Sequence, residues 1–187
     1  MKNIIISILI LVLSSCGLNN NSFSPPDADS PRRTVYIKGL NNFDQQYIAK
    51  AKKIIEDNFN FKCVVQSPVS LNYSETIFDC NEAQVELGYN TYKSYDYSDD
   101  INLFITTENL HLTEHKVRGL CYGNQVYIEQ YNGFDATLIH EMNHTIGLGH
   151  CKNECLMNSQ ARVRWNVKTD KPIYCKSCKS KLQEIDY

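Results

Sequence analysis

Apolar and polar positions follow two different periods along the first half of the folded chain. Thr34–Leu40 and Phe61–Gln66 are rich in β-forming residues, and both are predicted to be strands. Between them, Asn42–Asn58 carries apolar residues at helical spacing and charged residues on the other side, which predicts an amphipathic helix. This strand–helix–strand order indicates an α/β-type start, and Ile101–Thr106 is predicted to be a further strand.

The rest of the chain alternates less regularly. Leu71–Phe78 fits either a strand or an irregular loop, and Ala83–Lys93 fits a helix interrupted by Gly88. Later residues predict three further features: two short strands within Lys116–Tyr131 about a turn at Gly123-Asn124, a helix over Ala136–Ile146 with Asp135 as its N-cap, and a short helix over Ser177–Glu184. Together these elements predict an α+β fold with a small mixed sheet.

The first 33 residues differ in composition from the rest of the chain. Lys2 precedes an apolar run that is short for a membrane span and has the shape of a secretory signal. Its end, Leu13-Ser14-Ser15-Cys16, resembles a bacterial lipoprotein signal, which implies cleavage before Cys16 and lipid on its thiol. An ordinary signal peptide or an uncleaved anchor are the alternatives. Residues 16–33 read as a flexible tether and residues 34–187 as the folded domain.

Chain length and net charge limit which classes of function are expected. The chain has 187 residues, enough for one domain with its own core, and its formal net charge is −2. A broad basic surface for nucleic acid is therefore not expected. We expect a monomer that is exported and held at a membrane of the cell envelope, with the outer membrane as one candidate.

One motif carries most of the chemistry: His140-Glu141-x-x-His144-x-x-Gly147-x-x-His150. Histidines four residues apart on a helix lie on the same face and can reach one ion. A glycine at position 147 can take a positive φ, end the helix and return the chain so that His150 becomes a third ligand. The alternative is a helix that carries histidines by chance.

Three protein ligands with one open position are typical of a catalytic zinc ion. Glu141, next to His140, is predicted to be the general base for a zinc-bound water. Hydrolysis of a peptide bond in peptide or protein substrates is the leading hypothesis. A non-hydrolytic, zinc-stabilised surface binding module and a zinc hydrolase for non-peptide amides are the alternatives.

The extended motif followed by Met157 resembles the metzincin clan of zinc metallopeptidases. The cysteine spacing further resembles the archaemetzincin family, whose members carry a second zinc ion bound by four cysteines. The family usually has four residues between its first two cysteines, and this chain has three. By this resemblance the second zinc would be held by four residues, giving two zinc ions per chain: Cys151, Cys155, Cys175 and Cys178.

The resemblance also implies a metzincin-like zincin, with an active-site helix beside a twisted sheet and a cysteine-rich C-terminal subdomain. Met157 would form an apolar floor beneath the histidines. Leu120–Tyr122 would be the edge strand that binds an extended substrate, although a plain structural hairpin is an equally good interpretation. Trp165 and Tyr174 are predicted to be packing residues.

The remaining cysteines leave alternatives open. In an exported protein the four C-terminal cysteines could instead form two disulfides. Cys63 and Cys80 could pair with each other, although nothing in the sequence fixes that. Cys121 would then be a free thiol on the edge strand, and a role in capping the zinc ion is a hypothesis.

Overall fold

The computed structural model describes residues 33–70, 77–79, 100–112, 115–159, 165–166 and 171–185. The predicted signal, Cys16 and the predicted helix Ala83–Lys93 lie outside the described residues. Arg33, predicted to end the tether, is held by the fold: its guanidinium donates to the main-chain oxygen of Thr145 at 2.8 Å and to Asn124 Oδ1 at 2.9 Å.

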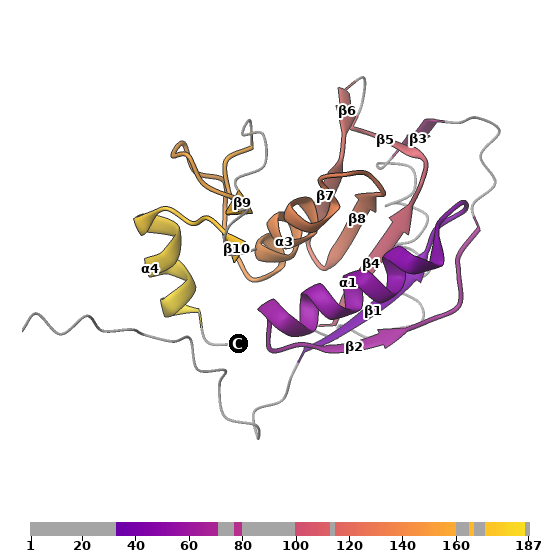
Figure 1. Cartoon of the computed structure of the whole chain (residues 1–187), viewed down its shortest axis with the longest axis horizontal. Coiled ribbons are helices and arrows are strands. Elements are labelled where there is room, and N and C mark those ends of the chain that lie inside the picture. The colour runs from indigo at the N-terminus through magenta and orange to yellow at the C-terminus, as the bar shows by residue number, and fades with distance from the viewer. Residues whose placement is uncertain are drawn as a thin grey trace, which may run out of the picture.

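A five-stranded mixed sheet forms the centre of the fold, in the order β2-β1-β4-β8-β7 (Figure 1). Four strands run parallel, and β7 pairs antiparallel with β8 at one edge. The bounds are Thr34–Gly39 for β1, Lys62–Val65 for β2, Ile101–Thr106 for β4, Gly119–Tyr122 for β7 and Gln125–Glu129 for β8. The strands predicted in these regions, and the turn at Gly123, are confirmed.

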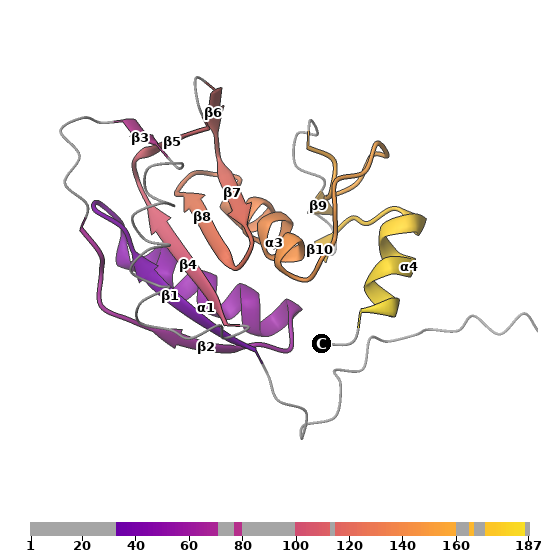
Figure 2. The same ribbon diagram turned by 180° about the vertical axis from the view of Figure 1, so that it is seen from behind.

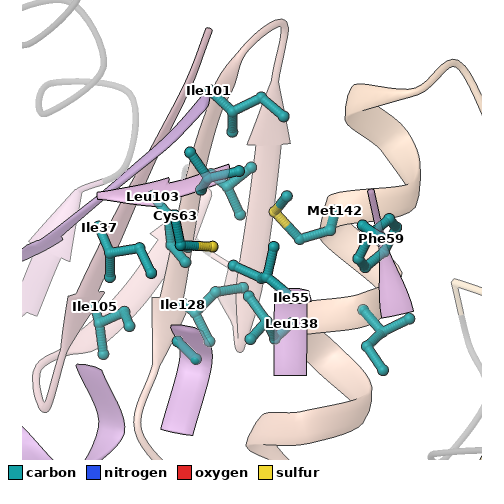
Figure 3. Close-up of a cluster of buried hydrophobic side chains, with 14 of the residues drawn as sticks. Ile37, Ile55, Phe59, Cys63, Ile101, Leu103, Ile105, Ile128, Leu138 and Met142 are labelled. Atoms are coloured by element: carbon teal, nitrogen blue, oxygen red, sulfur yellow. The ribbon is translucent and has the colours of Figure 1, made fainter. Parts of the chain in front are cut away.

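Two helices cover one face of this sheet, α1 (Gln45–Asn58) and α3 (Phe134–Thr145). Seen from behind, the sheet lies in front of both helices (Figure 2). Figure 3 shows Leu138 and Met142 of α3 beside Ile55 of α1, together with apolar side chains of the strands. Burial of this shared apolar surface fixes α3 against the sheet.

Both helices begin at positions that differ from the prediction. Helix α1 starts after Asp44, whose side chain accepts a hydrogen bond from the Gln46 N–H at 3.0 Å. Helix α3 starts after Gly133, so the prediction of Asp135 as N-cap was wrong. Asp135 lies in the first turn and forms an ion pair with Lys50 of α1, where its negative charge also suits the helix dipole.

Smaller elements flank the main sheet. A second sheet contains β3 (Ile77–Asp79), β5 (Asn109–Leu112) and β6 (His115–Val117). Of these, β5 and β6 were not predicted, and β6 takes residues assigned to the hairpin. The cysteine-rich C-terminal part, with β9 (Trp165–Asn166), β10 (Lys171–Pro172) and α4 (Lys176–Glu184), lies beyond α3 (Figure 1). No helix within the described ranges is long and apolar enough to cross a membrane.

Candidate active site

The three motif histidines converge on one point. Helix α3 presents His140 and His144, and Gly147, at φ 85°, turns the chain so that His150 joins them. The three Nε2 atoms are 3.1, 3.1 and 3.2 Å apart. Nitrogens held about 2.0–2.1 Å from one zinc ion at tetrahedral angles are roughly 3.3–3.4 Å apart. The donor set therefore fits zinc.

Main-chain carbonyls orient two of the rings. Nδ1 of His140 donates to the Leu156 oxygen, and Nδ1 of His144 donates to the Leu148 oxygen, both at 2.6 Å. A proton on Nδ1 leaves the lone pair of each Nε2 free to face an ion. Sequence reasoning missed both acceptors, because a carbonyl gives no signal in the identity of its residue.

Burial also favours the uncharged form of His140 and His144. Burial lowers the pKa of His140 to about 4, aided by the neighbouring His144 and His150 and opposed by the bond to Leu156. Burial likewise lowers the pKa of His144, against its bond to Leu148. Neutral imidazoles are the form that binds zinc, so no proton has to leave these rings at neutral pH.

Glu141 lies between α3 and the edge strand β7. Its side chain is buried, and this desolvation raises the pKa of its carboxyl to about 8. The backbone N–H of Cys121 donates to the carboxyl and partly offsets the rise. A carboxyl with a pKa near neutrality can both take up and release a proton under ordinary conditions.

The four C-terminal cysteines form a second cluster. All four thiols are free, and their sulfurs lie within 4.8 Å of one another. Sγ of Cys155 is 3.0 Å from that of Cys151 and 3.8 Å from that of Cys178. Disulfide sulfurs are about 2.05 Å apart, whereas thiolates about 2.3 Å from a tetrahedral zinc are roughly 3.8 Å apart. The two-disulfide alternative is therefore not what the structure contains, and the cluster fits zinc.

The hydrogen bonds around Cys175 favour its thiolate form. The backbone N–H of Cys178 and the side-chain amide of Asn153 donate to Cys175, and together they lower the pKa of Cys175 to about 6. The Asn153 contact is 3.5 Å long. Metal ligation requires a deprotonated thiol, so these donors favour the binding-competent form.

The two clusters share one chain segment, in which Cys155 directly precedes Leu156. The Leu156 carbonyl orients His140, and its N–H donates to the Ile173 oxygen at 2.7 Å. A second link joins the buried side chain of Asn143 in α3 to the Tyr174 hydroxyl at 2.7 Å. Tyr174 packs as predicted and also makes this bond. Sequence reasoning missed Asn143, whose only signal is a polar residue at a buried helix position.

Met157 is fully buried, in a cluster with Leu148, Cys155 and Cys178. Its carbonyl accepts a hydrogen bond from the Cys151 N–H at 2.9 Å. The methionine thus packs among the clustered cysteines, and its main-chain oxygen holds the N–H of the first of them, Cys151.

The remaining sequence predictions have mixed outcomes. Cys63 is a free, buried thiol that faces the Lys52 carbonyl, whereas Cys80 lies outside the described residues. Burial raises the pKa of Cys121 to about 12, with a further contribution from Glu141, which disfavours the thiolate that zinc capping would need. Trp165 lies in β9, and nothing is described of its side chain.

Comparison with known proteins agrees with this site. The model of Peptidase family M54 matches residues 121–184. Archaemetzincin from Aeropyrum pernix is 39% identical over 61 residues, 32% of this chain and 31% of the relative, so the match spans about a third of that protein. Archaemetzincin from Nanoarchaeum equitans is 26% identical over 148 residues, 74% of this chain and 84% of the relative.

The fold is also found among solved structures. The crystal structure of archaemetzincin from Methanopyrus kandleri aligns with a TM-score of 0.54 at 17% identity, covering 82% of this chain and 94% of that one. The fold and the three-histidine site resemble those of zinc metallopeptidases of the metzincin type. Within that class, the family model and the relatives show similarity to the archaemetzincins.

Proposed function

We propose that this chain hydrolyses peptide bonds with a zinc ion held by His140, His144 and His150 and with Glu141 as the general base. The observation that carries the proposal is the convergence of three Nε2 atoms at 3.1–3.2 Å. The two Nδ1 bonds support it, because they orient the lone pairs of His140 and His144 toward a shared ion.

A zinc ion held by His140, His144 and His150 would act as a Lewis acid, lowering the pKa of water and polarising the substrate carbonyl. Glu141 takes a proton from the attacking water, whose oxygen forms the new bond to the carbonyl carbon. The carbon–nitrogen bond then breaks, and Glu141 returns the same proton to the leaving nitrogen. A zinc ion at the histidines would favour the carboxylate form that accepts the proton, and the burial of Glu141 favours the return of that proton to the leaving nitrogen.

The test is a digest of a mixed peptide library by the full chain, with and without a zinc chelator. We expect cleavage that stops on chelation and returns when zinc is restored. Glu141→Ala should keep its zinc and lose turnover, since the ligands are unchanged. A zinc-loaded wild type that cleaves no peptide would contradict the proposal. A parallel panel of non-peptide amides and a peptide-capture assay would then separate the two alternatives.

We propose further that the thiolate cluster holds a second zinc ion. The four free sulfurs within 4.8 Å and the low pKa of Cys175 support this assignment. Metal analysis of the full chain should give about two zinc atoms, and His140→Ala should remove one of them. A single zinc atom in the wild type would count against the thiolate site.

We also propose that residues 1–15 direct export, that Cys16 carries lipid on a monomer at the cell envelope, and that residues 16–33 tether the enzyme. This proposal rests on the sequence of the first 33 residues. Fatty-acid labelling should mark the wild type but not Cys16→Ser. Sedimentation of the detergent-solubilised chain should give the mass of one protomer. Equal labelling of both proteins would refute the lipid assignment.

A further inference from the structure

We propose that Gly119 is a positioning residue for Glu141. This inference rests on the proposed function, in which Glu141 is the general base. A Cβ atom at position 119 would lie 2.6 Å from Cγ2 of Thr137, 2.8 Å from Cγ of Glu141 and 3.0 Å from its Oε1. Carbon atoms in contact are about 3.5–4.0 Å apart, so even one methyl group overlaps the acid. The bare backbone of Gly119 is what leaves room for the carboxyl against β7.

The same strand also supplies the donor that holds this carboxyl. The main-chain oxygen of Arg118 accepts a hydrogen bond from the Glu129 N–H of β8, so the main-chain polar groups of Arg118 point toward β8. Main-chain directions alternate along an antiparallel strand, and the N–H groups of Gly119 and Cys121 therefore point away from β8. The Cys121 N–H donates to Glu141. One residue of β7 thus provides the space and another, two positions along, provides the hydrogen bond.

Strand β7, helix α3 and Thr137 are all held in place, so a side chain at position 119 would have to displace the Glu141 carboxyl. Strand β7 is fixed by its register with β8, in which Gly119 pairs with Ile128. Helix α3 is fixed by Leu138 and Met142, both fully buried in the core. Thr137 can rotate its methyl group away only by giving up the contact between its hydroxyl and that of Tyr131. A side chain at position 119 would therefore displace Glu141 and break its bond to Cys121.

The decisive variant is Gly119→Ala, with Gly39→Ala as the matched control. Gly39 is also a strand glycine, at the end of β1 and away from the histidines, and a Cβ there would overlap the ring of Phe43. Both variants should lower the melting temperature through overpacking. Only Gly119→Ala should lower kcat, by about 10- to 100-fold, because a misplaced catalytic group loses rate on this scale. KM and zinc content should stay at wild-type values.

A second readout needs no turnover. In the metal-free protein the Cys121 amide lies on the open edge of the sheet, at β7. It should nevertheless exchange its hydrogen with solvent slowly, because it is hydrogen-bonded to Glu141. Gly119→Ala should speed this exchange at least about tenfold, to the level of Glu141→Ala, whereas Gly39→Ala should leave it unchanged. A wild-type kcat or a wild-type Cys121 exchange rate in Gly119→Ala would overturn the inference.

The proposed function and the positioning role of Gly119 can be refuted independently of each other. If the wild type cleaves no peptide, the proposed function falls, and the exchange rates still decide whether Gly119 positions Glu141. If Gly119→Ala does not fold, the pair Thr137→Ser and Gly119→Ala/Thr137→Ser makes the same comparison. Serine keeps the hydroxyl and removes the methyl group at 2.6 Å, while the 2.8 Å overlap with Glu141 remains. The double variant should then show the lower kcat and the faster exchange, and equal values in the pair would overturn the inference.

Discussion

Replacing Glu141 by glutamine measures how strongly the fold opposes a charge at this position. The side chain is 8% exposed, and burial raises the pKa of its carboxyl from 4.5 to about 8. A raised pKa means that the folded state binds the proton more tightly than the unfolded state. The resulting contribution to stability is complete below the unfolded-state pKa near 4.5 and is lost as the pH rises toward 8.

The size of the effect follows from the shift. Each pKa unit corresponds to about 1.4 kcal/mol, so the metal-free wild type should lose roughly 3–4 kcal/mol of unfolding free energy between pH 5 and pH 8 through this group alone. Glutamine has nearly the same shape and does not ionise. Glu141→Gln should therefore gain roughly 3–4 kcal/mol relative to the wild type over this range, although it removes the proposed base.

Urea unfolding of the chelator-treated proteins at both pH values gives the required difference. Asp135→Asn is the control, because it removes a partly exposed carboxylate from the same helix. Zinc at the histidines should shrink the effect, since a nearby positive charge favours the carboxylate. If the stabilities of wild type and Glu141→Gln change in parallel from pH 5 to pH 8 without metal, the carboxyl is not desolvated and the reasoning is wrong.

Three further substitutions test how the site is built. Cys155→Ser should lower zinc content from about two atoms per chain to about one, measured by metal analysis; an unchanged content would reject the thiolate site. Tyr174→Phe removes the acceptor of a buried amide of Asn143 and should cost about 1–3 kcal/mol of unfolding free energy, so no loss in urea would show that the bond is not stabilising. Met142→Ala empties a core position and should cost about 2–5 kcal/mol while the zinc-loaded enzyme keeps its kcat; a lost kcat would place Met142 in the site's function.

The convergence of the three histidines was predictable because the information is local. His140 and His144 are four positions apart, so helix geometry alone puts both rings on one face. The bend at Gly147 needs a positive φ, which glycine takes without strain, and the structure has it at 85°. The edge hairpin was predictable for a similar reason, since Gly123 also lies at positive φ, at 57°.

The start of α3 was not predictable from local signals. Asp135 has the chemistry of an N-cap, but Lys50 on α1 forms an ion pair with it, and the helix begins earlier, after Gly133. The partner on another helix appears only once the two helices pack together. The role of Gly119 was not predictable for the same reason, because Glu141 becomes its neighbour only when β7 packs against α3.

The link between the histidine cluster and the cysteine cluster likewise arises only in the folded chain. Cys155 is a predicted ligand of one cluster, and the next residue, Leu156, orients a histidine of the other through its carbonyl. The Leu156 N–H is in turn held by Ile173, which lies two residues before Cys175. Any movement of this segment that separates the sulfurs must therefore also move the acceptor of His140. Since a ring that loses its Nδ1 partner is free to rotate, the arrangement of the four cysteines also affects the orientation of His140.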